Sequence, residues 1–250
     1  MGQDEAVLVE VVVGDTREAW RAIGFAVGDD GTCRVGTTRI RLAGDDDGRG
    51  RGILGWTLAG LARPAVPSLV DDGLDGLPTA PAGDVAVPAA QAAHPNGATS
   101  IDHIVAITPD LDRTTAVVEA AGIRARRTRE AGRGRLQRFF RLGEVILELV
   151  GPVEPSGHGP ATFWGLTFTV ADIDATAGLL GDRVGTPKPA VQPGRRITTL
   201  RTHDAVSVPM AFMSGTDMSG TGLGDAAARP DRPAREPAPE GPGRSGDASL

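Results

Sequence analysis

The chain has 250 residues, 40% of them hydrophobic and 4% aromatic, and its formal net charge is −6. This length allows one or two domains. The acidic balance argues against nucleic acid as a partner, because binding to phosphates requires clustered positive charge. Cys33 is the only cysteine, which excludes an internal disulfide bond and predicts a reducing, cytoplasmic environment. The bias towards Ala, Arg, Gly and Asp, with Lys188 as the only lysine, suggests a bacterial chain.

The first patterned segment, residues 6–60, predicts a truncated unit of strand, helix and hairpin. It starts with an acidic stretch and a short apolar run, which match neither a signal peptide nor a membrane span of roughly 20 residues, so we expect no membrane partner. Residues 7–13 are β-branched and strand-like. Asp15 or Thr16 is then expected to cap a helix. A hairpin turning near Gly36 and a further strand at residues 52–59 follow.

The rest of the chain divides into a connector, two further units and a tail. Residues 61–98 are rich in Pro, Ala, Gly and Asp and lack a sustained period, which predicts an extended connector. Complete units of strand, helix and hairpin follow at residues 99–152 and 162–214, with helices expected to begin near Asp112 and Asp174. Residues 215–250 have almost nothing to bury and predict a disordered tail.

The three units align with one another by their own landmarks, which predicts a repeated architecture. Asp15, Asp110 and Asp172 fall at one point of the repeat, and Gly36 and Gly143 at another. This alignment places Gly165 opposite His103 and Ala211 opposite Glu148. In the first unit it places Leu8 and Arg41 at these two positions.

Strand alternation separates an apolar face from a mixed face, because successive side chains point to opposite sides. The apolar face, expected to pack on the helices, carries Phe140, Leu142, Val145, Leu147, Leu149 and, in the last unit, Trp164 and Leu166. His103 and Glu148 fall on the opposite face, as do Gln137 and Phe139. Glu10 and Arg41 fall on the same side of the first unit. We therefore expect a cleft lined by the mixed face.

Three motifs, Ile101-Asp-His-Ile-Val105, Pro109-Asp-Leu-Asp112 and Leu142-Gly-Glu-Val-Ile-Leu-Glu-Leu149, resemble those of the vicinal oxygen chelate superfamily, the group of glyoxalases, bleomycin-resistance proteins and extradiol dioxygenases. The resemblance covers residues 99–214. It implies an α+β fold in which two βαβββ modules pair into a half-barrel of mixed, curved sheets, with the first unit as a third, truncated module. It also implies a divalent metal held by a His on a module's first strand and a Glu on its last. Only His103 and Glu148 carry over, because Gly165 and Ala211 depart from the pattern.

The site chemistry leaves two alternatives open. An imidazole and a carboxylate suit Zn, Fe, Ni or Mn, but catalytic zinc normally has three protein ligands. A third ligand from Gln137, Glu10 or another subunit would complete the site. Otherwise His103 and Glu148 form a polar pair without metal, in which Glu148 acts in proton transfer if burial shifts its pKa.

These alternatives correspond to two functions for a cleft that takes a small molecule. One is a metal-dependent lyase, isomerase or dioxygenase, and the other is a non-catalytic protein that binds a ligand or sequesters an antibiotic. Gln137, Phe139, Glu10 and Arg196 are the candidate substrate contacts. Two of them have simpler interpretations: Glu10 as an ion pair with Arg41, and Arg196, with Arg195, as a surface residue.

Three further expectations concern structure. His94 is expected in a surface turn and Cys33 in the core. The unpaired first unit is expected either to pack on the paired modules or to pair with its twin in a homodimer.

Overall fold

The computed structural model describes residues 5–44, 50–62, 73–83, 93–201 and 206–215. These residues belong to one compact unit, Met1–Asp217. The predicted disordered tail lies outside the described residues, apart from Gly215. Within the described ranges, no helix is long and apolar enough to cross a membrane.

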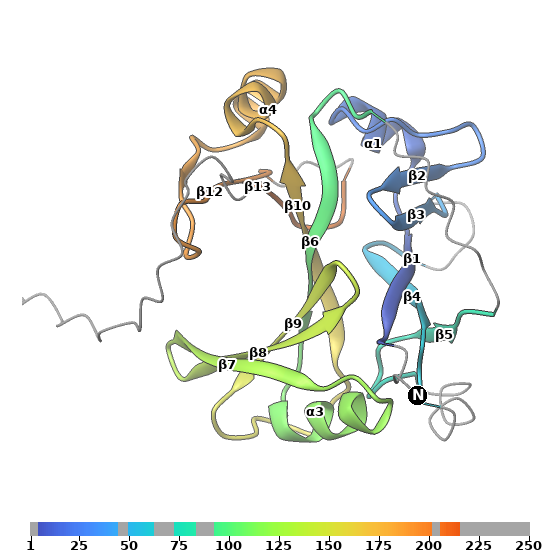
Figure 1. The fold of residues 1–250 in the computed structure, drawn as a ribbon, viewed down its shortest axis with the longest axis vertical. Helices are drawn as coiled ribbons and strands as arrows, with labels where there is room; N and C mark the ends of the chain where they lie inside the picture. The colour runs from blue at the N-terminus through green and yellow to red at the C-terminus, as the bar shows by residue number, and fades with distance from the viewer. Residues whose placement is uncertain (1–4, 45–49, 63–72, 84–92, 202–205, 216–250) are drawn as a thin grey trace, which may run out of the picture. The chain divides into compact units, whose positions relative to one another are not determined.

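Two complete βαβββ modules form one eight-stranded sheet (Figure 1), as predicted. The first module contains β6 (Ala98–Ile107), α3 (Leu111–Ala120), β7 (Ala125–Gly132), β8 (Arg135–Leu142) and β9 (Val145–Pro152). The second contains β10 (Thr162–Val170), α4 (Ile173–Leu180), the short 3-10 helix Gly181–Arg183, β11 (Lys188–Pro189), β12 (Arg196–Thr199) and β13 (Met210–Ser214). The strand order is β11-β12-β13-β10-β6-β9-β8-β7, and β6 and β10 pair antiparallel where the modules meet. The modules are therefore joined edge to edge through their first strands.

The helices of these modules begin slightly earlier than the sequence indicated. Asp110 caps α3 by accepting a hydrogen bond from the Arg113 amide, and Asp172 caps α4. In the first unit, Thr16 caps the helix by accepting from the Ala19 amide. Each cap satisfies an amide that the helix leaves without a partner.

The amino-terminal sheet is a reduced version of the same arrangement. It contains β1 (Val7–Val13), β2 (Thr32–Val35), β3 (Thr38–Leu42), β4 (Ile53–Ala59) and β5 (Thr79–Pro81), with α1 (Arg17–Ala22) after β1. Its order, β2-β3-β1-β4-β5, repeats β8-β9-β6-β10-β13 with the same strand directions. Strand β5 lies within the segment 61–98, so the described part of the connector completes this sheet.

Strand register identifies equivalent positions in the two sheets. Glu10 pairs with Thr57 as His103 pairs with Thr167, and each pair follows a bulge. Glu10 rather than Leu8 therefore occupies the His103 position, which corrects the alignment made from sequence. The shift arises because Thr16, not Asp15, caps the helix and the connection before it is one residue shorter. Arg41 does fall at the Glu148 position, as predicted.

Both sheets share one hydrophobic core. Trp20 of α1 lies at 6.2 Å, ring centroid to ring centroid, from Phe168 of β10, and Phe25 lies at 4.9 Å from Phe168. The Asn96 side chain donates to the Ile23 carbonyl at 3.0 Å, and the Ser207 hydroxyl donates to Asp15 at 2.6 Å. The first unit thus packs on the paired modules, which confirms that alternative. Its pairing in a homodimer stays a prediction.

Candidate functional site

The two faces of the eight-stranded sheet separate largely as predicted. Phe140, Leu142, Leu147 and Leu149 are buried in the core. Trp164 is an exception, because it is 52% exposed rather than packed on the helix side. A register shift between Phe163 and Gly165 explains the difference, since the extra residue at a bulge breaks the alternation of side chains.

Six polar side chains form a line across the face opposite the core, here called the polar row: Arg195, Asp102, His103, Glu148, Gln137 and Arg129. On one side of the row, the Gln137 amide donates to Glu148 Oε1 at 2.5 Å. Gln137 Oε1 in turn accepts from Arg129 Nε at 2.9 Å. Arg129 also lies over the Phe139 ring at 5.8 Å. These contacts hold Glu148 and Gln137 in fixed positions.

His103 lies near the middle of the polar row and is 5% exposed. Its Nδ1 contacts Asp102 Oδ2, and the Phe139 ring packs edge-on at 6.4 Å between centroids. Neighbouring strand residues normally point to opposite faces, but the register shift between Ile101 and His103 places Asp102 beside the imidazole. The contact orients the ring and leaves Nε2 as its available nitrogen.

Asp102 is a largely buried carboxylate with several partners. Its Oδ1 accepts from Arg195 Nη1 at 2.7 Å and from the Thr169 hydroxyl at 3.1 Å. Within the described part of the chain, Oδ2 has the ionic contact with His103 but no hydrogen bond of good geometry. Burial by itself would raise the pKa of Asp102, yet His103 and Arg195 outweigh it and lower the pKa to about 2. Asp102 is therefore ionised at neutral pH.

Glu148 has the opposite shift. Burial raises its pKa above the ordinary value, and the nearby charges of His103 and Arg129 oppose this only in part. A carboxyl group with a raised pKa exchanges its proton closer to neutral pH, which suits proton transfer or hydrogen bonding to a ligand. Within the polar row, Glu148 is therefore the group best suited to exchange a proton or to form a hydrogen bond with a ligand.

A cavity of about 470 Å³ lies over Glu148 and Gln137. Its apolar lining comes from both modules and includes Val105, Ile107, Val150, Trp164, Ile197 and Met210. Arg135, Thr167 and Thr199 add polar groups. A volume of this size and a mainly apolar lining with a few polar groups are typical of small-molecule sites.

The ligand set for a metal remains incomplete. Gly165 and Ala211 occupy the positions related to His103 and Glu148, as the alignment predicted. A Cβ at Gly165 would lie 2.6 Å from the Pro209 carbonyl oxygen, so the backbone itself excludes a side chain there. Among the described residues, no three His, Cys, Asp or Glu side chains cluster as metal ligands would. His103 and Glu148 alone do not fit the three-ligand requirement of a catalytic metal.

The other predicted contacts lie elsewhere. Glu10 is in the amino-terminal sheet, where it pairs with Arg39 at 2.5 Å and with Arg41 at 3.4 Å. Arg196 is half-exposed and pairs with Asp174 at 2.7 Å. Neither residue lines the cavity over Glu148. Of the predicted site residues, the structure brings together His103, Glu148, Gln137 and Phe139.

His94 and Arg195 differ from their expected surface positions. His94 is buried; its Nδ1 accepts from the Ala26 amide at 3.0 Å, so its Nε2 donates to the Arg34 carbonyl at 2.7 Å. Burial lowers the pKa of His94, and the bond to Arg34 offsets this only in part. The Arg195 side chain is largely buried against Asp102. Cys33 lies in the core as predicted, and burial raises the pKa of its thiol to about 12.

Sequence reasoning missed Asp102, Arg129, Arg135 and most of the cavity lining. Asp102 carried a signal, because a charged residue between Ile101 and His103 is unusual in a buried strand. The cavity-lining residues of β12 and β13 carried no such signal, because their position in the cavity depends on how the second module packs against the first.

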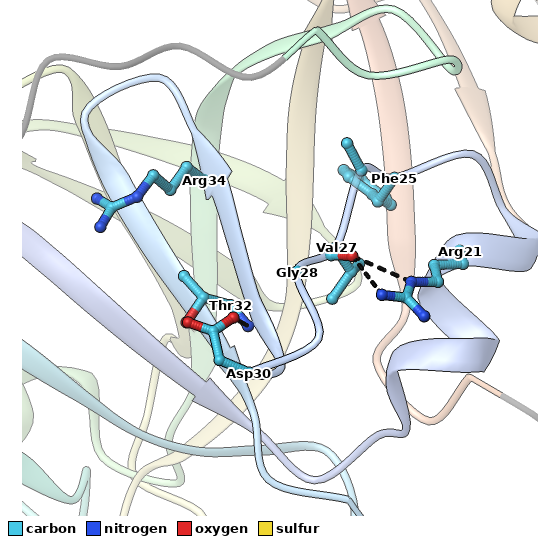
Figure 2. Close-up of a pocket in the computed structure, with 8 residues that line it drawn as sticks. Arg21, Phe25, Val27, Gly28, Asp30, Thr32 and Arg34 are labelled. Carbon is cyan, nitrogen blue, oxygen red and sulfur yellow. Dashed lines mark hydrogen bonds between the residues drawn. The ribbon is translucent and has the colours of Figure 1, made fainter.

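A second hollow, of about 550 Å³, lies beside α1 and is lined by Arg21, Phe25, Val27, Asp30 and Arg34 among others (Figure 2). Arg21 donates to the Val27 carbonyl from Nε at 3.0 Å and from Nη2 at 2.7 Å, as the dashed lines show. Asp30 accepts from the Thr32 amide at 2.9 Å. Arg21 and Asp30 are therefore held by backbone groups of the same loop.

Comparison with known structures supports the fold. A mutant of 4-hydroxymandelate synthase from Streptomyces coelicolor matches with a TM-score of 0.52 and 16% identity, over 85% of this chain and 93% of that protein. Methylmalonyl-CoA epimerases from Mycobacterium tuberculosis and Streptomyces coelicolor match at 19% and 25% identity over 47% and 48% of this chain, and 89% and 96% of theirs, each with a TM-score of 0.39. No family model and no curated protein matches. The chain has the vicinal oxygen chelate fold, as its motifs predicted.

Proposed function

We propose that the cavity over Glu148 binds a small molecule with a largely apolar body. The observation that carries this proposal is the cavity itself, in which the partly buried carboxyl group of Glu148 lines about 470 Å³ of mainly apolar space. The likeness to 4-hydroxymandelate synthase supports the fold and adds no substrate, because the identity is only 16%.

Glu148 is the polar anchor of this proposal. Gln137 occupies Oε1, whereas no described residue donates to Oε2. A hydroxyl or amine of a ligand can therefore donate to Oε2 without displacing a protein contact. Burying a ligand donor without such a partner would cost about 1–3 kcal/mol, so this oxygen favours ligands with a donor at the inner end. The proposal requires no resident metal.

Trp164 provides a direct test of binding. It is the one tryptophan that lines the cavity, whereas Trp20 and Trp56 are buried elsewhere in the core. Titration with naphthol, an apolar compound with one donor, should quench the emission of Trp164. The Trp164→Phe variant should lose this signal.

A cavity-filling variant adds the control. Ala211→Phe should weaken naphthol binding at least tenfold, because the new ring occupies the apolar space. Ala80 holds the equivalent position in the amino-terminal sheet, where it pairs with Thr57 as Ala211 pairs with Thr167. Ala80→Phe should leave binding unchanged. Equal affinity in wild type and Ala211→Phe would refute binding at this cavity.

A metal-dependent reaction is the second candidate. The Asp102–His103 contact favours it, because a carboxylate on one imidazole nitrogen is typical of metal-bound histidines. Two protein ligands are too few for tight binding, so a ligand's own oxygens would have to complete the site. Metal analysis of protein purified without chelator tests whether His103 and Glu148 hold a metal. Stoichiometric metal that His103→Ala abolishes would support this candidate, and its absence from folded wild type would exclude a metal that is resident before a ligand binds.

A further inference from the structure

We infer that the ligand of this cavity is an amphipathic anion, with its negative group bound by Arg135 and a hydrogen-bond donor at Glu148. The inference rests on the proposed function and adds the chemical class of the ligand. It follows from the position of Arg135, its lack of a protein partner and its spacing from Glu148.

Arg135 is the first residue of β8 and lines the cavity. Strand alternation places it on the same face as Gln137 and Phe139. In the part of the chain that the structure describes, no carboxylate or carbonyl accepts from its guanidinium. Arg129 and Arg138, on the neighbouring strand and the same strand, are held by Gln137 and Asp112. Arg135 is therefore a cavity-lining cation that is available to a ligand.

The separation of Arg135 and Glu148 along the sheet sets the length of the ligand. Phe139 pairs with Glu148 across β8 and β9, and Arg135 pairs with Pro152. Four residues of strand separate these pairs by about 13 Å. Between these two levels, Gln137 pairs with the apolar Val150, and Ile107 also lines the cavity. A ligand that reaches both ends needs an apolar body about the length of two fused rings.

The different groups at the two ends also set its orientation. Guanidinium groups bind carboxylates and phosphates through two parallel hydrogen bonds, so the anionic group belongs at Arg135. At the other end, the ionised form of Glu148 would repel an anion, whereas it accepts a hydrogen bond from a hydroxyl or amine. The inner end therefore selects a hydroxyl or amine, and the outer end selects the negative charge.

The test compares a hydroxynaphthoate, with hydroxyl and carboxylate at opposite ends of the ring pair, with the corresponding hydroxynaphthamide. Binding to the full chain is followed by quenching of Trp164. The acid should bind wild type about tenfold more tightly than the amide, the difference expected for one charge-assisted contact. Arg135→Gln should abolish this preference by weakening the acid alone. Arg133→Gln, a matched change in the adjacent turn, should preserve it.

The outcomes separate the inference from the proposed function. If acid and amide bind equally, or if Arg135→Gln weakens both alike, Arg135 does not bind the anion and the inference is wrong, while the cavity is still a binding site. If neither compound nor naphthol quenches Trp164, the proposed function fails as well. If the naphthoate without the hydroxyl binds as tightly as the hydroxynaphthoate, the donor at Glu148 is refuted separately.

Discussion

At the scale of single residues, Asp102 and Glu148 are carboxyl groups on one face with opposite pKa shifts. Asp102 has three positively charged or donating neighbours, His103, Arg195 and Thr169, which keep it ionised. Glu148 has one close donor, Gln137, and burial dominates its environment. The difference assigns a structural charge to Asp102 and an exchangeable proton to Glu148.

Asp102→Asn should destabilise the fold by on the order of 3 kcal/mol at neutral pH, because it leaves the largely buried Arg195 without its counter-charge. Since the pKa of Asp102 is lowered to about 2 from 3.8, its ionised form stabilises the fold above about pH 4, and this contribution is lost as the pH falls towards 2. Urea unfolding of both proteins across this range measures it. A difference independent of pH would contradict the ionised pair.

Glu148→Gln should stabilise the protein relative to wild type more at about pH 7 than at about pH 4. A raised pKa in the folded state means that wild type loses stability as the pH rises above the ordinary value of 4.5. The Gln variant lacks this loss and keeps an oxygen for the Gln137 amide. Urea unfolding at the two pH values tests the prediction, with the exposed Glu144→Gln as control. The same difference at both pH values would refute it.

At the scale of elements, the two sheets share one local arrangement, a backbone hydrogen bond between the residue after a glycine and a proline carbonyl. The Trp56 amide donates to the Pro78 carbonyl, and the Leu166 amide donates to the Pro209 carbonyl, both at 3.0 Å. Each donor directly follows a glycine, Gly55 or Gly165. Because glycine has no side chain, the segment that carries the proline can lie close to the strand that carries the glycine. In the second sheet, this close packing leaves no room for a metal-binding side chain at Gly165.

Gly165→Ala should cost about 1–3 kcal/mol, because its Cβ would meet the Pro209 oxygen at 2.6 Å and the strands must shift. Gly178→Ala on α4 is the control, since nothing lies within 4 Å of its Cβ. It should gain up to about 1 kcal/mol, because alanine is the better helix former. Thermal unfolding of both variants provides the measurement. Equal effects would show that the close approach at Pro209 does not constrain the sheet.

Many of the helices, strands and buried faces could be predicted from the sequence, and each wrong prediction has a physical cause. Strand alternation located the buried hairpin face, and capping aspartates located the helices to within two residues. Strand β5 has only three residues and no period, so it was indistinguishable from a connector. Two bulges defeated the alternation, misplacing Trp164 and concealing the contact between Asp102 and His103. The cavity depends on contacts between strands far apart in the chain, which no local pattern reports.

At the scale of the whole molecule, residues 94–97 join the amino-terminal unit to the paired modules. His94 bonds both the Ala26 amide and the Arg34 carbonyl, and Asn96 bonds the Ile23 carbonyl. Because Nδ1 of His94 accepts a hydrogen bond, protonation would place a donor against another donor. The connection between the units therefore depends on neutral His94.

Stability should fall as the pH drops below about 6.5. The pKa of His94 is lowered in the folded state, so the contribution of the neutral ring is complete above its ordinary value of 6.5 and is lost below it. His94→Gln should flatten this dependence in urea unfolding between about pH 8 and pH 5. His158→Gln, at an exposed position, should leave it intact. An unchanged pH dependence in His94→Gln would contradict this role.

The central claim is that the cavity over Glu148 is the binding site, and methyl NMR with naphthol tests it most directly. If naphthol binds there, the signals of Ile107, Ile197 and Met210, on three different strands around the cavity, should shift together on titration. Ile40, buried in the amino-terminal sheet, should not move. Shifts confined to the amino-terminal sheet, or no saturable shift among the three cavity methyls, would contradict the claim.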